Sequence, residues 1–253
     1  MTCLADVFRP SVAFASLALL KAAGCRVSVP RAQTCCGQPG YNSGDYQGAR
    51  EVARRVIAMF ESADYVVAPS GSCAGMIVRH YPRLLEGEWK ERAQALANRT
   101  WEISSFLTDV MPLPVADREQ DPTLSNRKIA YHDSCAGLRE LNIREQPRAL
   151  LRGHAGVEAL ELENRDVCCG FGGTFCAKMP EISATMASDK LRDTLNAGAD
   201  MLVGGDLGCL LSLAGRASRE GIDLEFRHVV ELIHEQRSAS GIGAATGTGT
   251  DTR

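Results

Sequence analysis

The chain has 253 residues, of which 45% are hydrophobic and 23% charged; this composition is typical of a soluble globular protein with one large domain or two ordinary ones. Its net charge of −3 gives no electrostatic reason to expect binding to nucleic acid or to an acidic membrane surface. No apolar run is long enough to span a membrane, and the N-terminal residues carry no signal-peptide pattern, so we expect a cytoplasmic protein whose thiols stay reduced.

Taken in chain order, the predicted elements alternate short strands with helices. Apolar residues at helical spacing predict helices over 45–62 and 181–197, the second of which starts after Pro180. Short apolar runs predict strands at Val27-Ser28-Val29, Tyr65-Val66-Val67, Ile129-Ala130-Tyr131 and Met201-Leu202-Val203. This alternation predicts an α/β fold with small parallel sheets.

Eight of the ten cysteines belong to one pattern that occurs twice. In each copy a single cysteine is followed by a Cys-Cys-Gly triplet and then by another single cysteine. The first set is Cys3, Cys35, Cys36 and Cys73, and the second set is Cys135, Cys168, Cys169 and Cys209. Corresponding members are offset by 132, 133, 133 and 136 residues. A helix, a short strand and a glycine-rich turn follow each triplet in the same order, which we interpret as an internal duplication.

The duplication predicts two pseudo-symmetric, Rossmann-like α/β repeats. We expect the first repeat at residues 1–110, a Pro-containing linker at 111–127, the second repeat at 128–237 and a disordered tail at 238–253. Cys73, Cys135 and Cys209 each come just after a predicted strand. Because ligands of open parallel sheets bind beyond the carboxyl ends of the strands, we expect the cysteine loops to meet at this edge, near the interface of the repeats.

The two repeats differ at their beginnings. A predicted strand from Lys128 to His132 leads into Cys135, whereas only Met1 and Thr2 precede Cys3. We therefore expect the true start of the protein to lie upstream of Met1.

Four kinds of chemistry compete to explain the cysteines. Structural disulfides are disfavoured by a reducing compartment and by the strain of bridging adjacent cysteines. Structural zinc sites usually use closely spaced C-x₂₋₄-C pairs, which this chain lacks. Buried, inert thiols suit Cys25, which stands outside the pattern, better than eight cysteines in register. We favour an iron–sulfur cluster in one or both repeats, because clusters take four cysteine ligands and glycine lets backbone N–H groups approach the sulfides.

Several segments resemble one known family. These are Thr34-Cys35-Cys36-Gly37-Gln38-Pro39-Gly40, Pro69-Ser70-Gly71-Ser72-Cys73, Tyr131-His132-Asp133-Ser134-Cys135 and Cys168-Cys169-Gly170-Phe171-Gly172-Gly173. They resemble the cysteine-rich CCG-domain proteins, and most closely the lactate-utilization A family, over nearly the whole chain.

The resemblance implies an oxidoreductase component: an iron–sulfur electron-transfer subunit of a complex that oxidises L-lactate to pyruvate. It implies partner proteins, among them a ferredoxin-type iron–sulfur protein. It also implies one or two 4Fe–4S clusters. Their ligands would be Cys3, Cys35, Cys36 and Cys73 in the first set and Cys135, Cys168, Cys169 and Cys209 in the second.

The chain departs from the fuller family pattern at its last cysteine. That pattern ends in C-x-x-C, where this chain has Met76 after Cys73 and Ser212 after Cys209. The departure weakens the alternative of a thiol/disulfide redox subunit of the heterodisulfide reductase B type. A non-catalytic zinc scaffold remains the other alternative.

The sequence identifies no catalytic residue. The glycine-rich runs lack the G-x-G-x-x-G spacing, so we expect no nicotinamide or other nucleotide. We expect Cys176 to be a small loop residue, with a redox-active thiol as the alternative. We expect Asp133 to cap a helix and His132 to be hydrogen-bonded, with a proton relay or a donor to the cluster as the alternative for this pair.

Overall fold

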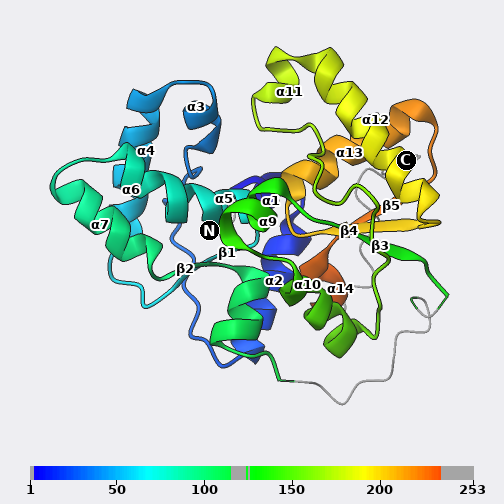
Figure 1. Ribbon diagram of the computed structural model, residues 1–253. Coiled ribbons are helices and arrows are strands. Elements are labelled where there is room, and N and C mark those ends of the chain that lie inside the picture. Colours follow the sequence, from blue (N-terminus) through cyan, green and yellow to red (C-terminus); the bar gives the residue numbers. More distant parts are fainter. Residues whose placement is uncertain (1–2, 115–123, 125, 235–253) are drawn as a thin grey trace, which may run out of the picture.

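The first half of the protein is mostly helical. Figure 1 presents a computed structural model, which describes residues 3–114, 124 and 126–234. The helices of this half are α1 (Cys3–Phe8), α2 (Pro10–Ala22), α3 (Gln38–Asn42), α4 (Tyr46–Phe60), α5 (Gly71–Gly75), α6 (Tyr81–Leu84), α7 (Glu88–Ala97) and α8 (Ile103–Ser105). Two π-helical turns, η1 (Met76–His80) and η2 (Phe106–Val110), and two strands, β1 (Val66–Ala68) and β2 (Thr100–Glu102), complete it.

The second half contains a larger sheet. Its helices are α9 (Cys135–Leu141), α10 (Glu145–Leu150), α11 (Phe175–Lys178), α12 (Pro180–Asn196), α13 (Leu207–Glu220) and α14 (Val229–His234), with a π-helical turn η3 (Leu151–Ala155). Its strands are β3 (Ile129–His132), β4 (Met201–Gly204) and β5 (Glu225–His228). Most of the linker expected at 111–127, and the whole tail expected at 238–253, lie outside the described residues.

Helices α4 and α12 confirm the two helices predicted from apolar spacing. Asp45 begins α4 by accepting a hydrogen bond from the Gly48 amide at 2.9 Å, and the apolar stripe of the helix is buried. Pro180 is the first residue of α12, where its missing N–H costs no hydrogen bond and its fixed φ suits the helix.

The strands form two small parallel sheets, as the alternation of elements predicts. Strand β1 pairs with β2, and the second sheet has the order β3-β4-β5. All residues of β3 and β4 are buried, which is typical of parallel strands covered on both faces. Strands β2 and β5 were not among the sequence predictions. The fold is therefore α/β with a duplicated strand–helix arrangement.

One predicted strand is wrong. Residues 27–29 do not form a strand, although Val27 and Val29 favour extended backbone. Propensity alone does not make a strand, because a strand is stabilised by pairing with hydrogen-bonded neighbours in a sheet.

The molecule has two lobes with a junction between them. In Figure 1, α3, α4, α6 and α7 form one lobe, α11, α12 and α13 the other, and α5 and α9 lie between. The first repeat's own core is formed by α4, β1, η1, α6 and α7. A larger core joins the second sheet to α1 and α2.

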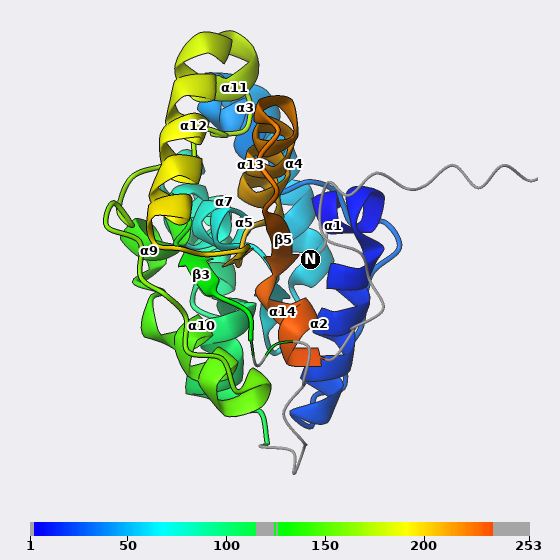
Figure 2. The ribbon, with the colours of Figure 1, turned by 90° about the vertical axis from the view of Figure 1, so that its right-hand side faces the viewer.

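Helix α2 packs on α14 at the far end of the chain, as Figure 2 shows from the side. The buried Glu231 carboxylate of α14 accepts hydrogen bonds from Arg9 at 2.8 Å and from Ser11 at 2.6 Å. The N-terminal helices thus complete the core around the second sheet.

Candidate metal centre

The two Cys-Cys-Gly triplets adopt the same backbone turn. Gly37 and Gly170 have φ angles of 83° and 84°, in the left-handed region that favours glycine. A Cβ atom on Gly170 would lie 2.7 Å from the Ser183 carbonyl oxygen of α12, and one on Gly37 would lie 3.2 Å from the Val52 side chain of α4. Glycine is therefore needed at both positions, and each turn fixes its cysteine pair against the following helix.

The single cysteines lie in the first turns of helices. Cys73 is in α5, Cys135 begins α9 and Cys209 is in α13, and each of these helices follows a strand as predicted. Ser70 and Ser134 are the capping residues of α5 and α9, and each hydroxyl accepts a hydrogen bond from a backbone amide of the first turn. The partial positive charge of a helix N-terminus stabilises a thiolate or another negative group there.

The structure brings together three cysteines of the first set. The buried Cys36 thiol hydrogen-bonds to the thiols of Cys35 and Cys73. These contacts raise the pKa of Cys36 and lower that of Cys73, as expected when neighbouring thiols compete for one proton. The Tyr81 hydroxyl donates to the Cys36 carbonyl oxygen at 2.8 Å and holds the pair in place. Cys3 is the first residue of α1; its side chain is outside the described part of the structure.

The structure brings together all four cysteines of the second set. Their thiols form a continuous chain of contacts in the order Cys135, Cys168, Cys169 and Cys209. The Sγ atoms of Cys135 and Cys168 are 4.0 Å apart, and the Gly170 amide donates to the Cys168 Sγ atom at 3.4 Å. Hydrogen bonds from the neighbouring thiols lower the pKa of Cys168 and raise the pKa of Cys169, which is buried.

His132 is the nitrogen-bearing side chain of this site. One of its ring nitrogens lies within 4.8 Å of the Sγ atoms of Cys169 and Cys209, and the side chain is 1% exposed. Neither ring nitrogen has a hydrogen-bond partner within the described structure. Burial lowers the pKa of His132 to about 4, so the imidazole is neutral at pH 7. The prediction that His132 is hydrogen-bonded is therefore wrong.

Asp133 does not cap a helix, and that prediction is also wrong. Ser134 takes the capping position of α9, and both carboxylate oxygens of Asp133 accept hydrogen bonds from Arg148, at 2.9 and 2.8 Å. The guanidinium also pairs with Glu161 and lies 5.0 Å from the centre of the Tyr131 ring. This buried network fixes the turn between β3 and α9, and with it the position of Cys135.

The two cysteine sets meet at a junction between the repeats. Ser70 and Asp206, at equivalent positions, form an antiparallel bridge. The Asp206 carboxylate accepts hydrogen bonds from the Ser70 hydroxyl at 3.1 Å and the Ser72 amide at 2.9 Å. Helices α5 and α9 pack beside this bridge, where a Cβ atom on Gly71 would lie 2.9 Å from the Cα atom of Gly137. The turns that carry Cys73, Cys135 and Cys209 are thus in contact.

Cys176 lies in the short helix α11 rather than among the four thiols of the second set. Its thiol donates to the Gly173 carbonyl oxygen at 3.1 Å. Ser43, the equivalent residue of the first repeat, hydrogen-bonds to the Thr174 hydroxyl at 2.9 Å, so α3 and α11 meet at the ends of the two lobes. The structure therefore places Cys176 in a short helix rather than in the expected loop.

The donor chemistry of both sets suits a metal or iron–sulfur centre. The cysteines whose side chains are described form no disulfide, and a bound metal would replace the protons of the clustered thiols. One of the unpartnered ring nitrogens of His132 lies beside the sulfur atoms of Cys169 and Cys209. Sequence reasoning had no signal for Asp206 or for the unpartnered state of His132, because both depend on contacts between segments far apart in the chain.

Comparison with known proteins gives the same picture. The family described as CCG, cysteine-rich domain, matches residues 1–78 and 129–214, one segment in each half of the chain. Lactate utilization protein A of Geobacillus sp. is 41% identical over 237 residues, which cover 93% of this chain and 97% of that protein. The proteins of that name from Halalkalibacterium halodurans (43% over 238 residues, 93% and 95%) and, as lactate utilization protein A 1, from Bacillus mycoides (40% over 245 residues, 96% and 98%) are equally similar. Among the residues described, no helix has the length and apolarity needed to cross a bilayer.

Proposed function

Because this chain belongs to the cysteine-rich CCG family, together with the lactate utilization A proteins, we propose that it is the iron–sulfur electron-transfer subunit of a system that oxidises L-lactate to pyruvate. The observation that carries the proposal is the continuous contact among four thiols beside the unpartnered His132. A set of four thiols drawn from three turns is the ligand set of an iron–sulfur cluster.

The proposed ligands form two sets, and the chain holds one or two 4Fe–4S clusters according to how many sets are loaded. The second set is Cys135, Cys168, Cys169 and Cys209, and the first is Cys3, Cys35, Cys36 and Cys73. When bound, such a cluster accepts and releases single electrons at a potential set by nearby charges, hydrogen bonds and solvent access.

The protein's own contribution is the surroundings of those ligands. Cys36 and Cys169 are 1% exposed, so their sulfur atoms are shielded from water. The neutral imidazole of His132 would supply an N–H group beside a bound cluster, and the Asp206 carboxylate adds a negative charge near both sets. These groups tune how readily the centre takes up an electron.

Partner proteins complete the proposed system. The cysteine sets account for electron transfer alone, and oxidation of a 2-hydroxy acid also needs a base for its proton and an acceptor for its hydride. We therefore assign lactate oxidation to the assembled complex in the cytoplasm, with a ferredoxin-type iron–sulfur protein as one electron-transfer partner.

Growth on L-lactate tests the role in the cell. In a strain without another lactate dehydrogenase, deletion of the gene should abolish growth on L-lactate and leave growth on pyruvate unchanged. The wild-type gene and the Cys176→Ser variant should restore growth, whereas Cys209→Ser should not. Normal growth of the deletion strain on L-lactate would refute the proposal.

A second assay separates the disulfide-reductase alternative. The anaerobic protein is mixed with a low-potential electron donor and a small disulfide, and thiol release is followed. Electron transfer without disulfide reduction is the expected result. Catalytic thiol release that requires the cysteines of either set would instead favour the thiol/disulfide function.

A further inference from the structure

The second repeat buries a lysine side chain, although lysine is almost never fully buried unless it is paired. Lys190 of α12 is 1% exposed. Its Nζ atom donates to the Asn164 carbonyl oxygen at 2.5 Å and lies 3.8 Å from the Asp193 carboxylate. Because removing an ammonium group from water is costly even in an ion pair, an apolar residue of similar volume would stabilise this core as well or better.

The first repeat has an apolar residue at the equivalent position. Val52 of α4 faces the glycine of the first Cys-Cys-Gly triplet, and Met186 of α12 faces the glycine of the second. Counting four residues onward in each helix places Lys190 at the position of Val56. Val56 is 0% exposed, so the two helices bury the same face and differ there by one positive charge.

The Lys190 side chain lies near the thiols of the second set. Long helical side chains lean towards the N-terminus of their helix, and in α12 this is the end where Met186 faces the triplet. The Asn164 carbonyl that holds the ammonium group belongs to the loop leading into Cys168. Burial lowers the pKa of Lys190, and the charges of Cys168 and Cys169 are among those that oppose this shift. The ammonium group therefore acts electrostatically on this cysteine pair.

Asp193 only partly offsets this charge at the thiols. It lies one turn beyond Lys190 along α12, away from the triplet, and its carboxylate accepts a hydrogen bond from the Asn164 amide at 3.0 Å. The positive end of the ion pair thus faces the cysteines. After the larger effect of burial, the charge of Lys190 also lowers the pKa of His132, whose ring lies beside two of the thiols.

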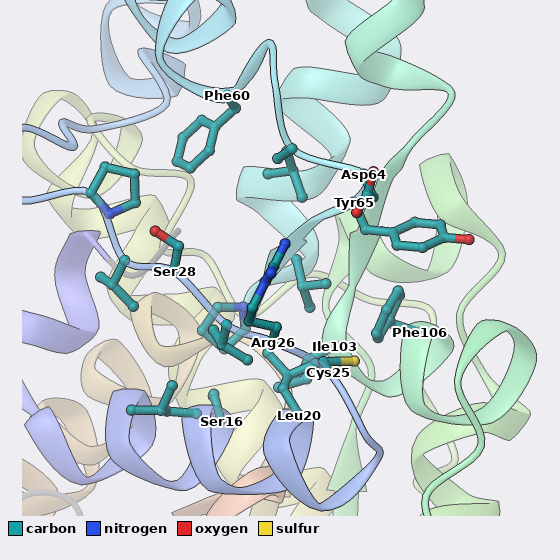
Figure 3. Close-up of a pocket in the computed structure, with 18 of the residues that line it drawn as sticks. Ser16, Leu20, Cys25, Arg26, Ser28, Phe60, Asp64, Tyr65, Ile103 and Phe106 are labelled. Carbon is teal, nitrogen blue, oxygen red and sulfur yellow. The ribbon is translucent and has the colours of Figure 1, made fainter.

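The first repeat offers a solvated cation instead. Arg26 beside β1 is exposed and points into a cavity of about 650 Å³ (Figure 3), where water screens its charge. Asp206 adds a negative charge near Cys73 of the first set and near Cys209 of the second, so it does not distinguish the sets. The buried ammonium group of Lys190 makes the two sets electrostatically unequal.

We propose that Lys190 raises the reduction potential of the centre held by the second set, so that an electron entering the chain comes to rest in the second repeat. Uptake of one electron adds one negative charge to the centre and makes or breaks no bond. A buried positive charge stabilises that electron more than a solvated charge does, because the surrounding dielectric is low. The inference rests on the proposed electron-transfer function and adds a direction to it.

Redox titration followed by EPR, on full-length protein purified without oxygen, tests the effect of the charge. Lys190→Met keeps most of the side-chain volume and should lower the equilibrium constant for reduction of the second-set centre about tenfold, or about 59 mV. Lys190→Arg keeps the charge and should keep the potential, and Lys190→Gln should repeat the methionine result. Arg192→Gln removes a cation of the same helix whose side chain is 67% exposed, and it should leave the potential unchanged.

Single-centre proteins compare the two sets without changing Lys190. Cys169→Ser leaves the first set intact, and Cys36→Ser leaves the second set intact. We expect the centre of the second set to have the higher potential. An equal or lower potential for the second set, an unchanged potential in Lys190→Met, or an equal shift in Arg192→Gln would overturn the inference.

Cobalt binding tests the same charge without an iron–sulfur cluster. Four thiolates around Co²⁺ carry a net negative charge, which a nearby ammonium group stabilises. In the Cys36→Ser background, Lys190→Met should therefore weaken Co²⁺ binding by the second set about tenfold, measured from thiolate-to-cobalt absorption. Unchanged affinity, or no Co²⁺ binding by the second set, would overturn the inference. The expected cobalt result in a protein that assembles no iron–sulfur cluster would instead refute the proposed function alone.

Discussion

Ser70 and Asp206 occupy equivalent positions of the two repeats and bind each other across the junction. The Ser70 hydroxyl donates to Asp206 Oδ2 at 3.1 Å, and the Ser72 amide donates to the same oxygen at 2.9 Å. Asp206 thereby satisfies an amide at the start of α5 in the other repeat and none at the start of its own helix, α13. One buried carboxylate ties together the turns that carry the two cysteine sets.

We expect the Asp206→Asn substitution to raise the reduction potential of the bound centre. The Asp206 carboxylate places a negative charge near the sulfur atoms of Cys73 and Cys209, and this charge disfavours an added electron. Its removal should raise the potential by about 50 mV, which is about 1 kcal/mol for one electron. Redox titration followed by EPR measures the shift. The Glu61→Gln variant, on the exposed Glu61–Arg92 pair, is the charge control, and an equal shift in both variants would contradict the prediction.

We expect Gly71→Ala to destabilise the junction. The new Cβ atom would lie 2.9 Å from the Gly137 Cα atom and from the Ser134 hydroxyl oxygen, so α5 and α9 would have to move apart. Overpacking of this kind costs about 1–3 kcal/mol of unfolding free energy. Gly215→Ala is the matched control, because a Cβ atom there meets nothing within 4 Å in the middle of α13, and alanine should stabilise that helix by about 0.5–1 kcal/mol. Urea denaturation measures the free energy of unfolding of both variants. Equal changes in that free energy would contradict the close approach of Gly71 to Gly137.

We expect Glu102 to make stability fall as the pH rises. Burial raises the pKa of this carboxyl from 4.5 to about 7, so the folded state binds a proton more tightly than the unfolded chain does. The stabilisation is complete below pH 4.5 and is lost as the pH rises to 7, by about 3 kcal/mol. Glu102→Gln should remove this contribution, so the difference in stability between the two proteins should change across pH 5–8. Urea denaturation measures this difference in the free energy of unfolding. A difference that stays constant across pH 5–8 would contradict the raised pKa of Glu102.

We expect His132→Leu to lower the potential of the centre held by the second set without loss of iron. Leucine keeps most of the side-chain volume and removes the N–H donor, which otherwise stabilises the more negative, reduced state. The shift should be on the order of 50 mV, measured by EPR-monitored titration. His154→Gln on η3 is the control. An unchanged potential would contradict the role of His132, and loss of iron would make it a ligand instead.

Much of the fold follows from local sequence patterns. Local patterns correctly predicted two helices and three strands. These are α4, from its apolar stripe, α12, from Pro180 at its start, and β1, β3 and β4, from their apolar runs. Strand β2 was not predicted from the sequence, because Thr-Trp-Glu contains no apolar run. Strand β5 was not predicted because Glu and Arg alternate with its buried residues. Residues 27–29 show the opposite error, a strand that was predicted and does not form. Their side chains favour extended backbone, but no strand of the described chain pairs with them.

The candidate site also has one part that the sequence predicts and another that it does not. The repeated spacing predicts that the cysteines gather in two sets, because the pattern reports a duplication of structure. The state of His132 and the pairing of Asp133 with Arg148 could not be predicted, since each depends on which side chains a distant segment brings near. The contact between Asp206 and Ser70 depends on how the two repeats are arranged in space. The sequence of either repeat alone does not reveal that arrangement.

Iron and acid-labile sulfide per chain, measured on protein purified without oxygen, test the central claim most directly. The account predicts brown protein with about four iron atoms and four sulfides for each loaded set. The Cys169→Ser variant should lose the centre of the second set, and Cys176→Ser should keep it. Colourless protein that carries stoichiometric zinc, or that binds no iron on reconstitution with iron and sulfide, would contradict the account.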